Sequence, residues 1–367
     1  MFKVLYEDKE ARIGELKVGN KKVETPFFMP VATKMTVKYI NSVKLNEMQV
    51  NAVISNAFIL SMRPGSKFVK KIGGIGKFMN FKGINFSDSG GFQMYSKSIY
   101  HKSNDNGIYF RNPYSGEKIF MTPEENMKIQ LNLGSDVAMC LDSMPMYEES
   151  YEDIRKSVNK TIEWAKKCKI VHDKLNKNNQ LLFGISQGGK YEDLREECIR
   201  ELIKLNFDGY SIGGFGLGET KEEEFKIIKL HRKMISKNKP IYLMGIGDPV
   251  EILEAINLGC DIFDSRMPTQ NARRGSLFTD NGKLRILKKD YESDKNPIDK
   301  RCNCFVCKNY NRSYIRYLLK EDESVGKELA SYHNIYFLNN LIKDARTAIK
   351  NKKFYNFLKN FKKRYKI

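Results

Sequence analysis

Two aspartates end short apolar runs and could carry acid–base or nucleophilic chemistry. Asp88 closes a run that begins at Ile84, and Asp264 follows the pair Ile262-Phe263. Two such carboxylates can divide the work at a sugar carbon, because one can attack as a nucleophile while the other transfers a proton. The plainer alternatives are that Asp88 caps a helix and that Asp264 belongs to a salt-bridged turn.

Positive charge surrounds Asp264 in the sequence. Arg266, Arg273 and Arg274 follow it closely, and the whole chain of 367 residues has 64 Lys+Arg against 44 Asp+Glu, a net charge of +20. A carboxylate flanked by guanidiniums suits an anionic polymer that is held by its phosphates while one atom is attacked. The charge indicates a nucleic-acid partner, although a lysine-rich genome produces a similar composition.

The C-terminal segment adds to this charge. Between Lys343 and Ile367 there are ten Lys or Arg and one acid, Asp344. Apolar side chains recur there at helical spacing: Phe354, Phe357, Leu358, Phe361 and Tyr365. We expect residues 346–367 to form a basic helix that packs through this stripe, in preference to stacking bases on it.

Strand-like runs alternate with amphipathic stretches along most of the chain. The expected strands are Phe27–Ala32, Ala52–Leu60, Ile84–Asp88, Asp136–Asp142, Leu181–Gln187, Gly209–Gly213, Ile241–Gly245 and Asp261–Met267. The expected helices are Thr36–Val50, Thr122–Leu133, Tyr151–Leu175, Tyr191–Leu205, Lys221–Ile235 and Val250–Leu258. Eight strands in this alternation predict an α/β fold of the (β/α)8 TIM-barrel type, a single catalytic domain over residues 1–367.

Smaller units should decorate the barrel. Residues 1–25 alternate around Gly19-Asn20 and predict an N-terminal β cap. Residues 103–121 predict a hairpin inserted after the third strand, turning at 112–116. A metal-binding subdomain is expected over residues 290–345.

In such barrels the reactive groups lie where the strands end, at one mouth. Besides Asp88 and Asp264, the strand ends supply Asp142, Gln187 and the Gly213-Gly214 turn. A planar heterocycle would fit there, with Asp142, Gln187 and the Gly214 amide on its hydrogen-bonding edge. Phe92 and Met244 could pack against its two faces.

Three cysteines within six residues have the form of a metal site. Cys302, Cys304 and Cys307, joined by His333 from a later helix, can complete a tetrahedron around one structural Zn²⁺ per chain. The other cysteines, Cys140, Cys168, Cys198 and Cys260, lie in apolar or helical segments and should be buried or inert. Seven cysteines in total, an odd number, favour a reducing cytoplasm over a disulfide framework.

The remaining signals are negative. No apolar segment is long enough to span a bilayer, and the N-terminus lacks the apolar core of a signal peptide, so no membrane association is expected. His101, His172 and His231 lie in hydrophilic stretches, and we assign them no chemistry.

The chain resembles the tRNA-guanine transglycosylases, also called queuine tRNA-ribosyltransferases, of bacterial type. The resemblance covers nearly the whole chain and lies in five motifs in order: Phe86-Ser-Asp-Ser-Gly-Gly-Phe-Gln, Gly184-Ile-Ser-Gln-Gly-Gly, Tyr242-Leu-Met-Gly-Ile-Gly, Phe263-Asp-Ser-Arg-Met-Pro-Thr and the Cys302-x-Cys-x2-Cys-x25-His zinc pattern.

This resemblance implies exchange of guanine at the wobble position 34 of GUN-anticodon tRNAs for a 7-deazaguanine, queuine or preQ1. Asp264 is then the nucleophile that forms a covalent ribosyl-enzyme, and Asp88 the general base. The implied substrate-binding residues are Ser89, Phe92, Asp142, Gln187, Gly214, Leu217 and Met244. The implied RNA-binding residues, at the anticodon loop, are Arg266, Gln270, Arg273 and Arg274. A homodimer with the zinc subdomain near its interface is also implied.

Some positions depart from the family pattern. Asp142-Ser143-Met144-Pro145 is one residue shorter than the usual Asp-Glu-Cys-Thr-Pro, Leu217 replaces a Val or Gly, and both bear on which base is inserted. Gln270 replaces an Arg and Ser265-Arg266 a Cys-Val pair, which bears on anticodon contact. Two alternatives stay open: a non-catalytic tRNA-binding paralogue or partner subunit on the same barrel, and a carboxylate-pair glycosidase.

Overall fold

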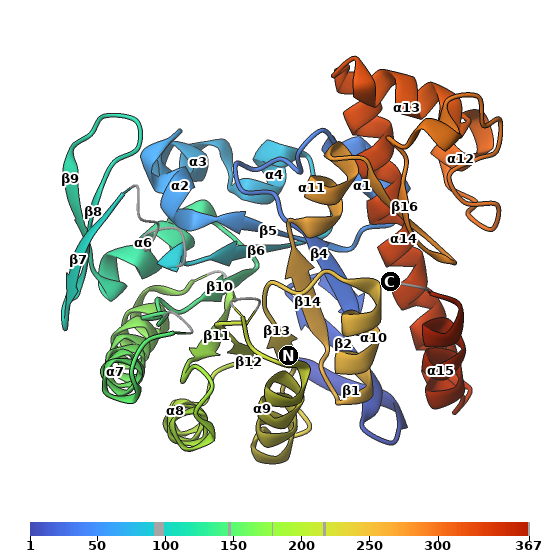
Figure 1. Cartoon of the computed structure of the whole chain (residues 1–367). Coiled ribbons are helices and arrows are strands. Elements are labelled where there is room, and N and C mark those ends of the chain that lie inside the picture. The colour runs from blue at the N-terminus through green and yellow to red at the C-terminus, as the bar shows by residue number, and fades with distance from the viewer. Residues whose placement is uncertain (92–98, 146–147, 178, 216–217, 366–367) are drawn as a thin grey trace.

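In the computed structural model, which describes residues 1–91, 99–145, 148–177, 179–215 and 218–365, eight parallel strands form a barrel surrounded by helices (Figure 1). The expected contacts of Phe92 and Leu217 therefore lie outside the described residues.

The bounds of the elements are as follows. The strands are β1 (Phe2–Asp8), β2 (Ala11–Val18), β3 (Lys21–Glu24), β4 (Phe27–Pro30), β5 (Ala52–Asn56), β6 (Ile84–Asp88), β7 (Tyr100–Asn104), β8 (Gly107–Arg111), β9 (Lys118–Met121), β10 (Val137–Met139), β11 (Leu181–Ser186), β12 (Gly209–Ile212), β13 (Ile241–Leu243), β14 (Ile262–Ser265), β15 (Ser276–Thr279) and β16 (Gly282–Arg285). The helices are α1 (Ser42–Glu47), α2 (Ala57–Met62), α3 (Ser66–Ile72), α4 (Ile75–Met79), α6 (Pro123–Leu133), α7 (Tyr151–Leu175), α8 (Glu192–Lys204), α9 (Lys221–Met234), α10 (Pro249–Asn257), α11 (Met267–Arg273), the 3-10 helix Lys289–Tyr291, α12 (Phe305–Asn309), α13 (Arg312–Lys320), α14 (Ser324–Lys350) and α15 (Phe354–Arg364).

The barrel strands follow the order β4-β14-β13-β12-β11-β10-β6-β5, with every neighbouring pair parallel. A parallel bridge between Val31 and Ile54, with a 2.7 Å hydrogen bond from Ala32 N to Ile54 O, joins the two ends of the sheet. The predicted (β/α)8 barrel is therefore confirmed.

The barrel interior and the N-terminal sheet share one core. Phe86, Phe183 and Tyr242 from barrel strands are buried in the same cluster as Phe2 and Leu16 from the sheet β1-β2-β3. That sheet therefore plugs the end of the barrel at which the strands begin. A second, larger cluster lies between the strands and the surrounding helices.

Several predicted boundaries are wrong. The strand expected over Asp136–Asp142 spans only Val137–Met139, and three further differences have a local reason. The run from Ala52 stays a strand only to Asn56, because the Asn56 side chain accepts a 2.8 Å bond from Ile59 N and begins α2. The helix expected over Thr36–Val50 is limited to α1, which Asn41 caps. The strand expected over Asp261–Met267 ends at Ser265, since Pro268 is compatible with the first turn of a helix and α11 begins at Met267.

The insertion after β6 is larger than predicted. It forms a three-stranded antiparallel sheet, β7-β8-β9, rather than a hairpin, and projects from the edge of the barrel in Figure 1. The predicted turn is present, since Gly116 N donates to Asn112 O at 2.8 Å.

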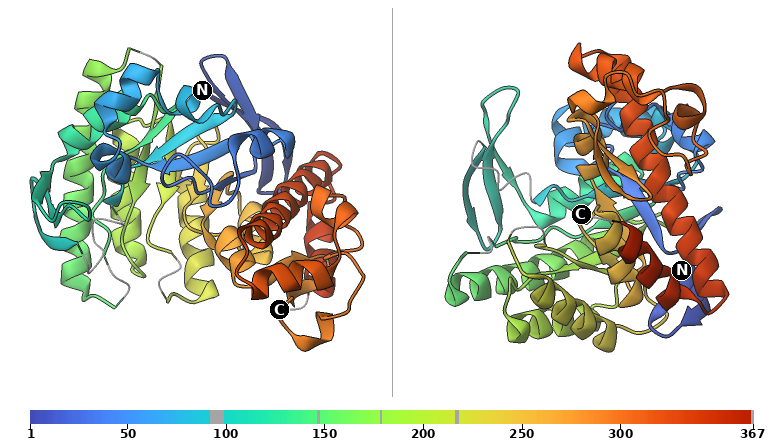
Figure 2. Two further views of the ribbon diagram at one scale, coloured as in Figure 1. Left: turned by 90° about the horizontal axis from the view of Figure 1, so that it is seen from above. Right: turned by 45° about the vertical axis from the view of Figure 1, so that its right-hand side comes forward.

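Two C-terminal helices complete the chain. The long helix α14 runs along one side of the barrel (Figure 2). Phe354, Leu358 and Phe361 of α15 are buried, whereas Lys359 and Lys362 are exposed, so the aromatic stripe packs and the outer face is basic. The single helix expected over residues 346–367 is divided, because residues up to Lys350 belong to α14 and α15 begins at Phe354. No helix of the described ranges has the length and apolar character that crossing a bilayer requires.

Candidate functional site

The three expected carboxylates meet at one end of the barrel. Asp88 is the last residue of β6, Asp264 lies in β14, and Asp142 follows β10. Burial, followed by the neighbouring charges of Asp142 and Asp264, raises the pKa of Asp88 to about 7. A carboxyl group with this pKa can both donate and accept a proton near neutral pH.

Asp264 is held by two donors. Tyr242 Oη donates to Asp264 Oδ1 at 2.6 Å, and Gly245 N donates to the same oxygen at 3.0 Å. Burial raises the pKa of Asp264, and these two hydrogen bonds oppose the rise. Both bonds go to Oδ1, and Oδ2 accepts none from a described residue.

Asp142 and Gln187 form a polar pair. Gln187 Nε2 donates to Asp142 Oδ2 at 2.6 Å, and both side chains are buried. Burial raises the pKa of Asp142 to about 6, against the opposing effect of this hydrogen bond. Gln187 Oε1 is buried without a partner among the described residues. A buried acceptor of this kind calls for a donor, which a bound heterocycle could supply.

The turn at Gly213-Gly214 lies directly against this pair. Gly214 has a φ of +78°, and a Cβ at this position would lie 2.9 Å from Gln187 Oε1. Only glycine therefore lets the backbone approach Gln187 so closely. The Gly214 backbone is thus beside the polar pair.

Two further candidates lie nearby with different surroundings. Ser89 is fully buried, and its Oγ accepts a 3.2 Å bond from Gly91 N, which stabilises the turn after Asp88. Met244 is partly exposed and packs at the edge of the barrel core. Asn56 Nδ2 also reaches Asp88 Oδ2, at 3.4 Å.

Sequence reasoning missed two residues that organise this end of the barrel. Tyr242 reads as an ordinary apolar strand residue, although it is the hydroxyl donor to Asp264. Arg195 reads as a surface residue of an amphipathic helix, yet it is fully buried under the glycine turns. His231 is likewise buried, not in a hydrophilic environment, and contacts Ser186 Oγ at 2.9 Å.

The candidate RNA-binding residues lie on and beside α11. Arg266 and Arg274 are exposed at its two ends, and Gln270 is partly buried between them. The Arg273 guanidinium lies over the Tyr39 ring, 5.9 Å from its centroid, and burial lowers its pKa. Because α11 directly follows β14, these side chains are within a few residues of Asp264.

The four expected metal ligands come together. Cys302, Cys304 and Cys307 place their Sγ atoms 3.8, 3.5 and 3.4 Å from His333 Nδ1, and all four ligand atoms lie within 4.8 Å of one another. A tetrahedral Zn²⁺ with ordinary bond lengths separates a sulfur and a nitrogen ligand by about 3.5 Å. His333 Nε2 contacts Phe278 O at 2.6 Å, which fixes Nδ1 as the ligand atom. The geometry fits zinc.

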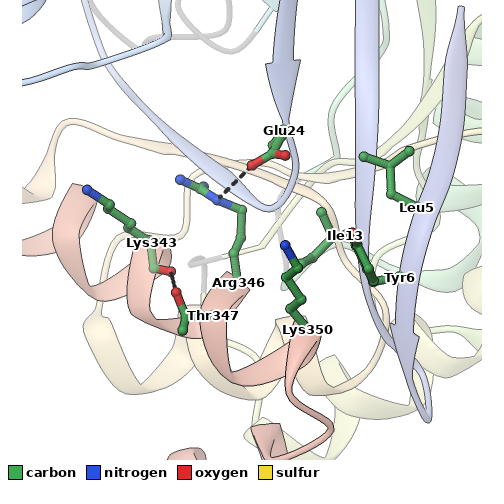
Figure 3. A pocket seen from close by; sticks show the side chains of 8 residues that line it. All are labelled: Leu5, Tyr6, Ile13, Glu24, Lys343, Arg346, Thr347 and Lys350. Carbon is green, nitrogen blue, oxygen red and sulfur yellow. Dashed lines mark hydrogen bonds and ion pairs between the residues drawn. The ribbon is translucent and has the colours of Figure 1, made fainter.

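A separate hollow of about 480 Å³ lies between the N-terminal sheet and α14 (Figure 3). Lys343, Arg346 and Lys350 line it, and Arg346 Nη1 donates to Pro26 O at 2.6 Å. Since Pro26 precedes β4, this hollow is at the opposite end of the barrel from the three carboxylates. It does not form part of their site.

Comparison with known proteins identifies relatives that match nearly the whole chain. The family model "Queuine tRNA-ribosyltransferase" matches residues 8–367. The curated queuine tRNA-ribosyltransferase of Fusobacterium nucleatum is 42% identical over 366 residues, covering 99% of this chain and 98% of its own. Those of Thermoanaerobacter sp. and Halothermothrix orenii are 43% and 40% identical over 355 residues, each covering 97% of this chain and 94% of the relative. The chain belongs to the queuine tRNA-ribosyltransferase family.

Proposed function

We propose that this protein is a tRNA-guanine transglycosylase, which exchanges guanine at wobble position 34 of GUN-anticodon tRNAs for a 7-deazaguanine, queuine or preQ1, in queuosine modification. The observation that carries the proposal is the arrangement of Asp264 and Asp88. Tyr242 and Gly245 orient Asp264 through hydrogen bonds to Oδ1, and the charge of Asp264 contributes to the raised pKa of Asp88. Family membership agrees with this chemistry.

The reaction begins with displacement. Asp264 Oδ2 attacks the ribose C1′ of the wobble nucleoside, the C1′–N9 bond breaks, and guanine leaves as a ribosyl ester forms on Asp264. Asp88 supplies the proton that the leaving guanine needs, which its raised pKa permits. No redox or nucleotide cofactor is required, because the ester preserves the activation of C1′.

The second step reverses the first with another base. Asp88, now ionised, takes the proton from N9 of the incoming 7-deazaguanine, N9 attacks C1′, and the ester bond to Asp264 breaks. The carboxylate of Asp264 is regenerated, so atoms and protons balance over the cycle.

Base recognition follows from the polar groups beside the carboxylates. Asp142 can accept from the N–H groups of the purine edge, and the Gly214 amide and the second N–H of Gln187 Nε2 can donate to its carbonyl oxygen. Met244 packs one face of the base; the packing of Phe92 and the effect of Leu217 remain proposals from the sequence. Ser89 acts by shaping the turn that carries Asp88.

The anticodon loop is held over the barrel mouth by α11 and the residues next to it. Arg266, Arg273 and Arg274 can pair with phosphates, and Gln270 can contact a base or sugar. The net charge of +20 supplies the wider attraction for tRNA. A tRNA-modifying role places the protein in the cytoplasm.

A structural Zn²⁺ would organise residues 290–345, which include the first part of α14 and precede the basic helix α15. Cys302, Cys304, Cys307 and His333 would hold the ion, which would tie the cysteine loop to α14 and stabilise that unit without contacting substrate.

We also propose a homodimer with its interface near this zinc unit. Phe305, Tyr314 and Tyr317 of α12 and α13 are 50%, 44% and 57% exposed, and exposed aromatic side chains on one part of a surface are typical of an interaction site. Light scattering of the purified protein tests this: a monomer at micromolar concentration contradicts it.

The deciding experiment measures exchange of labelled guanine into a tRNA with G34, with a matched tRNA carrying A34 as control. Incorporation into the first tRNA alone supports the proposal. A non-catalytic paralogue would bind both without exchange and give no denaturation-resistant adduct. A glycosidase would be indifferent to the RNA.

A further inference from the structure

Arg195 lies fully buried beneath the two glycine turns that border the base site. It belongs to the first turn of α8. Its Nε donates to Gly189 O at 2.9 Å, and its Nη1 donates to Ser186 O at 3.1 Å and to Gly213 O at 2.8 Å. One guanidinium therefore joins the ends of β11 and β12.

These contacts set the direction of neighbouring groups. In a trans peptide the C=O and the following N–H point in opposite directions. Because Gly213 O points toward Arg195, the N–H of Gly214 points away from it. Arg195 also binds Ser186 O, directly before Gln187, and Gly189 O, two residues after it. The guanidinium therefore fixes the backbone on both sides of Gln187.

Gln187 and the Gly214 turn are also packed on each other. A Cβ at Gly213 would lie 2.6 Å from Gln187 Nε2, and one at Gly214 would lie 2.9 Å from Gln187 Oε1. A small rotation of either turn would therefore move the Gln187 carboxamide, and with it the 2.6 Å hydrogen bond to Asp142 Oδ2.

Burying the Arg195 cation costs free energy, so the contacts that it makes indicate its role. Burial lowers the pKa of Arg195 to about 10, so it stays protonated at neutral pH. Among the described residues, the Arg195 side chain donates hydrogen bonds to backbone carbonyls alone, and the Phe215 ring lies 5.2 Å away. The planar fork of arginine can serve several carbonyls at once, whereas a lysine ammonium cannot reproduce that geometry.

We propose that Arg195 is a positioning residue for base recognition: it holds the Gly214 N–H and the Gln187 carboxamide in the arrangement that reads the carbonyl edge of the purine. This inference rests on the proposed base exchange. It assigns Arg195 no contact with the substrate and no part in proton transfer.

The test compares Arg195→Lys with Arg200→Lys, which changes an exposed arginine of the same helix that pairs with Glu196. Four quantities are measured for each: the KM for guanine, the inhibition constant of 2-aminopurine, tRNA affinity and the melting temperature. 2-Aminopurine lacks the carbonyl oxygen to which the Gly214 N–H would donate.

For Arg195→Lys we expect the KM for guanine to rise at least tenfold, with tRNA affinity within twofold of the wild type. The preference for guanine over 2-aminopurine should fall, because the lost orientation matters only for the carbonyl group. Arg200→Lys should change none of these. Arg195→Gln, which keeps one amide NH2 donor group but no charge, should give the same changes. It replaces the lysine variant in the test if that variant does not fold.

An unchanged preference for guanine over 2-aminopurine in a folded variant would overturn the proposal, even if the melting temperature fell, because the arginine would then be structural only. A wild-type protein that exchanges no guanine would instead contradict the proposed function. The two failures are therefore distinguishable.

Discussion

Tyr242 and Asp264 come from neighbouring strands, and the tyrosine hydroxyl donates a 2.6 Å hydrogen bond to the proposed nucleophile. Burial raises the pKa of Tyr242 well above its ordinary value, so the hydroxyl keeps its proton and acts only as a donor. The bond orients the carboxylate and opposes the rise that burial causes in the pKa of Asp264.

Tyr242→Phe should slow adduct formation by roughly tenfold, about 1.4 kcal/mol. Since the lost hydrogen bond lowered the pKa of Asp264, that pKa should rise, and the ionised fraction should fall most at acidic pH. The acidic limb of the rate profile should move to higher pH. Tyr210→Phe, a buried tyrosine on β12, is the control. An acidic limb at the same pH in both variants contradicts this role for Tyr242.

Asp264→Asn should abolish both guanine exchange and the denaturation-resistant tRNA adduct, because a neutral amide cannot attack C1′. Binding of tRNA should be largely retained, since the phosphates are held by other residues. Gel electrophoresis of enzyme and tRNA under denaturing conditions is the measurement. An adduct that persists in the variant would assign the nucleophile to another residue.

Asp88→Asn should slow turnover by on the order of 10²–10⁴-fold without loss of tRNA binding. The pKa of Asp88 is about 7 in the free protein partly because Asp264 is charged. Once Asp264 is esterified that charge is gone, so the pKa of Asp88 should be lower in the adduct. Base transfer to preformed adduct should therefore rise with pH through a midpoint below 7, and the dependence should vanish in Asp88→Asn. A midpoint above 7 would contradict the role of Asp264.

Much of this site was accessible from sequence because it consists of strand ends. Asp88, Asp142 and Gln187 each end an apolar run of the sequence. Because parallel strands of a barrel end at one mouth, the sequence predicts that these three side chains lie together. The four residues that could hold a metal ion were predictable from their types and spacing. Tyr242 and Arg195 were not, because their roles depend on which strands are neighbours and on a helix turning one charged residue inward. The break at Asn56 was missed because an apolar run can continue from strand into helix when a side chain caps the helix.

Cys304→Ala should remove zinc and lower the melting temperature. Cys304 is buried, and its Sγ also accepts a 3.3 Å bond from Cys307 N at the start of α12. Loss of one thiolate opens the tetrahedron and releases the loop from α14. Metal analysis and thermal unfolding are the measurements, with Cys260→Ala, a buried cysteine remote from the cluster in sequence, as control. Full zinc content and unchanged melting of Cys304→Ala would contradict the assignment.

The shortened segment after Asp142 should favour a bulky 7-substituent, so we expect queuine to be a better substrate than preQ1. Ser143 N donates to Thr161 Oγ1 at 3.0 Å, which ties this segment to α7, and Ser143 is buried. Ser143 stands where the family pattern has a glutamate. The chain therefore lacks a negative charge that would attract the cationic aminomethyl group of preQ1. From the sequence, Leu217 is expected to work in the opposite direction, because a leucine side chain is larger than the glycine that would leave room for the cyclopentenediol. The measurement is competition of queuine, preQ1 and preQ0 against labelled guanine already in the tRNA. A kcat/KM tenfold higher for preQ1, about 1.4 kcal/mol in transition-state binding, would contradict the effect expected of the shortened segment.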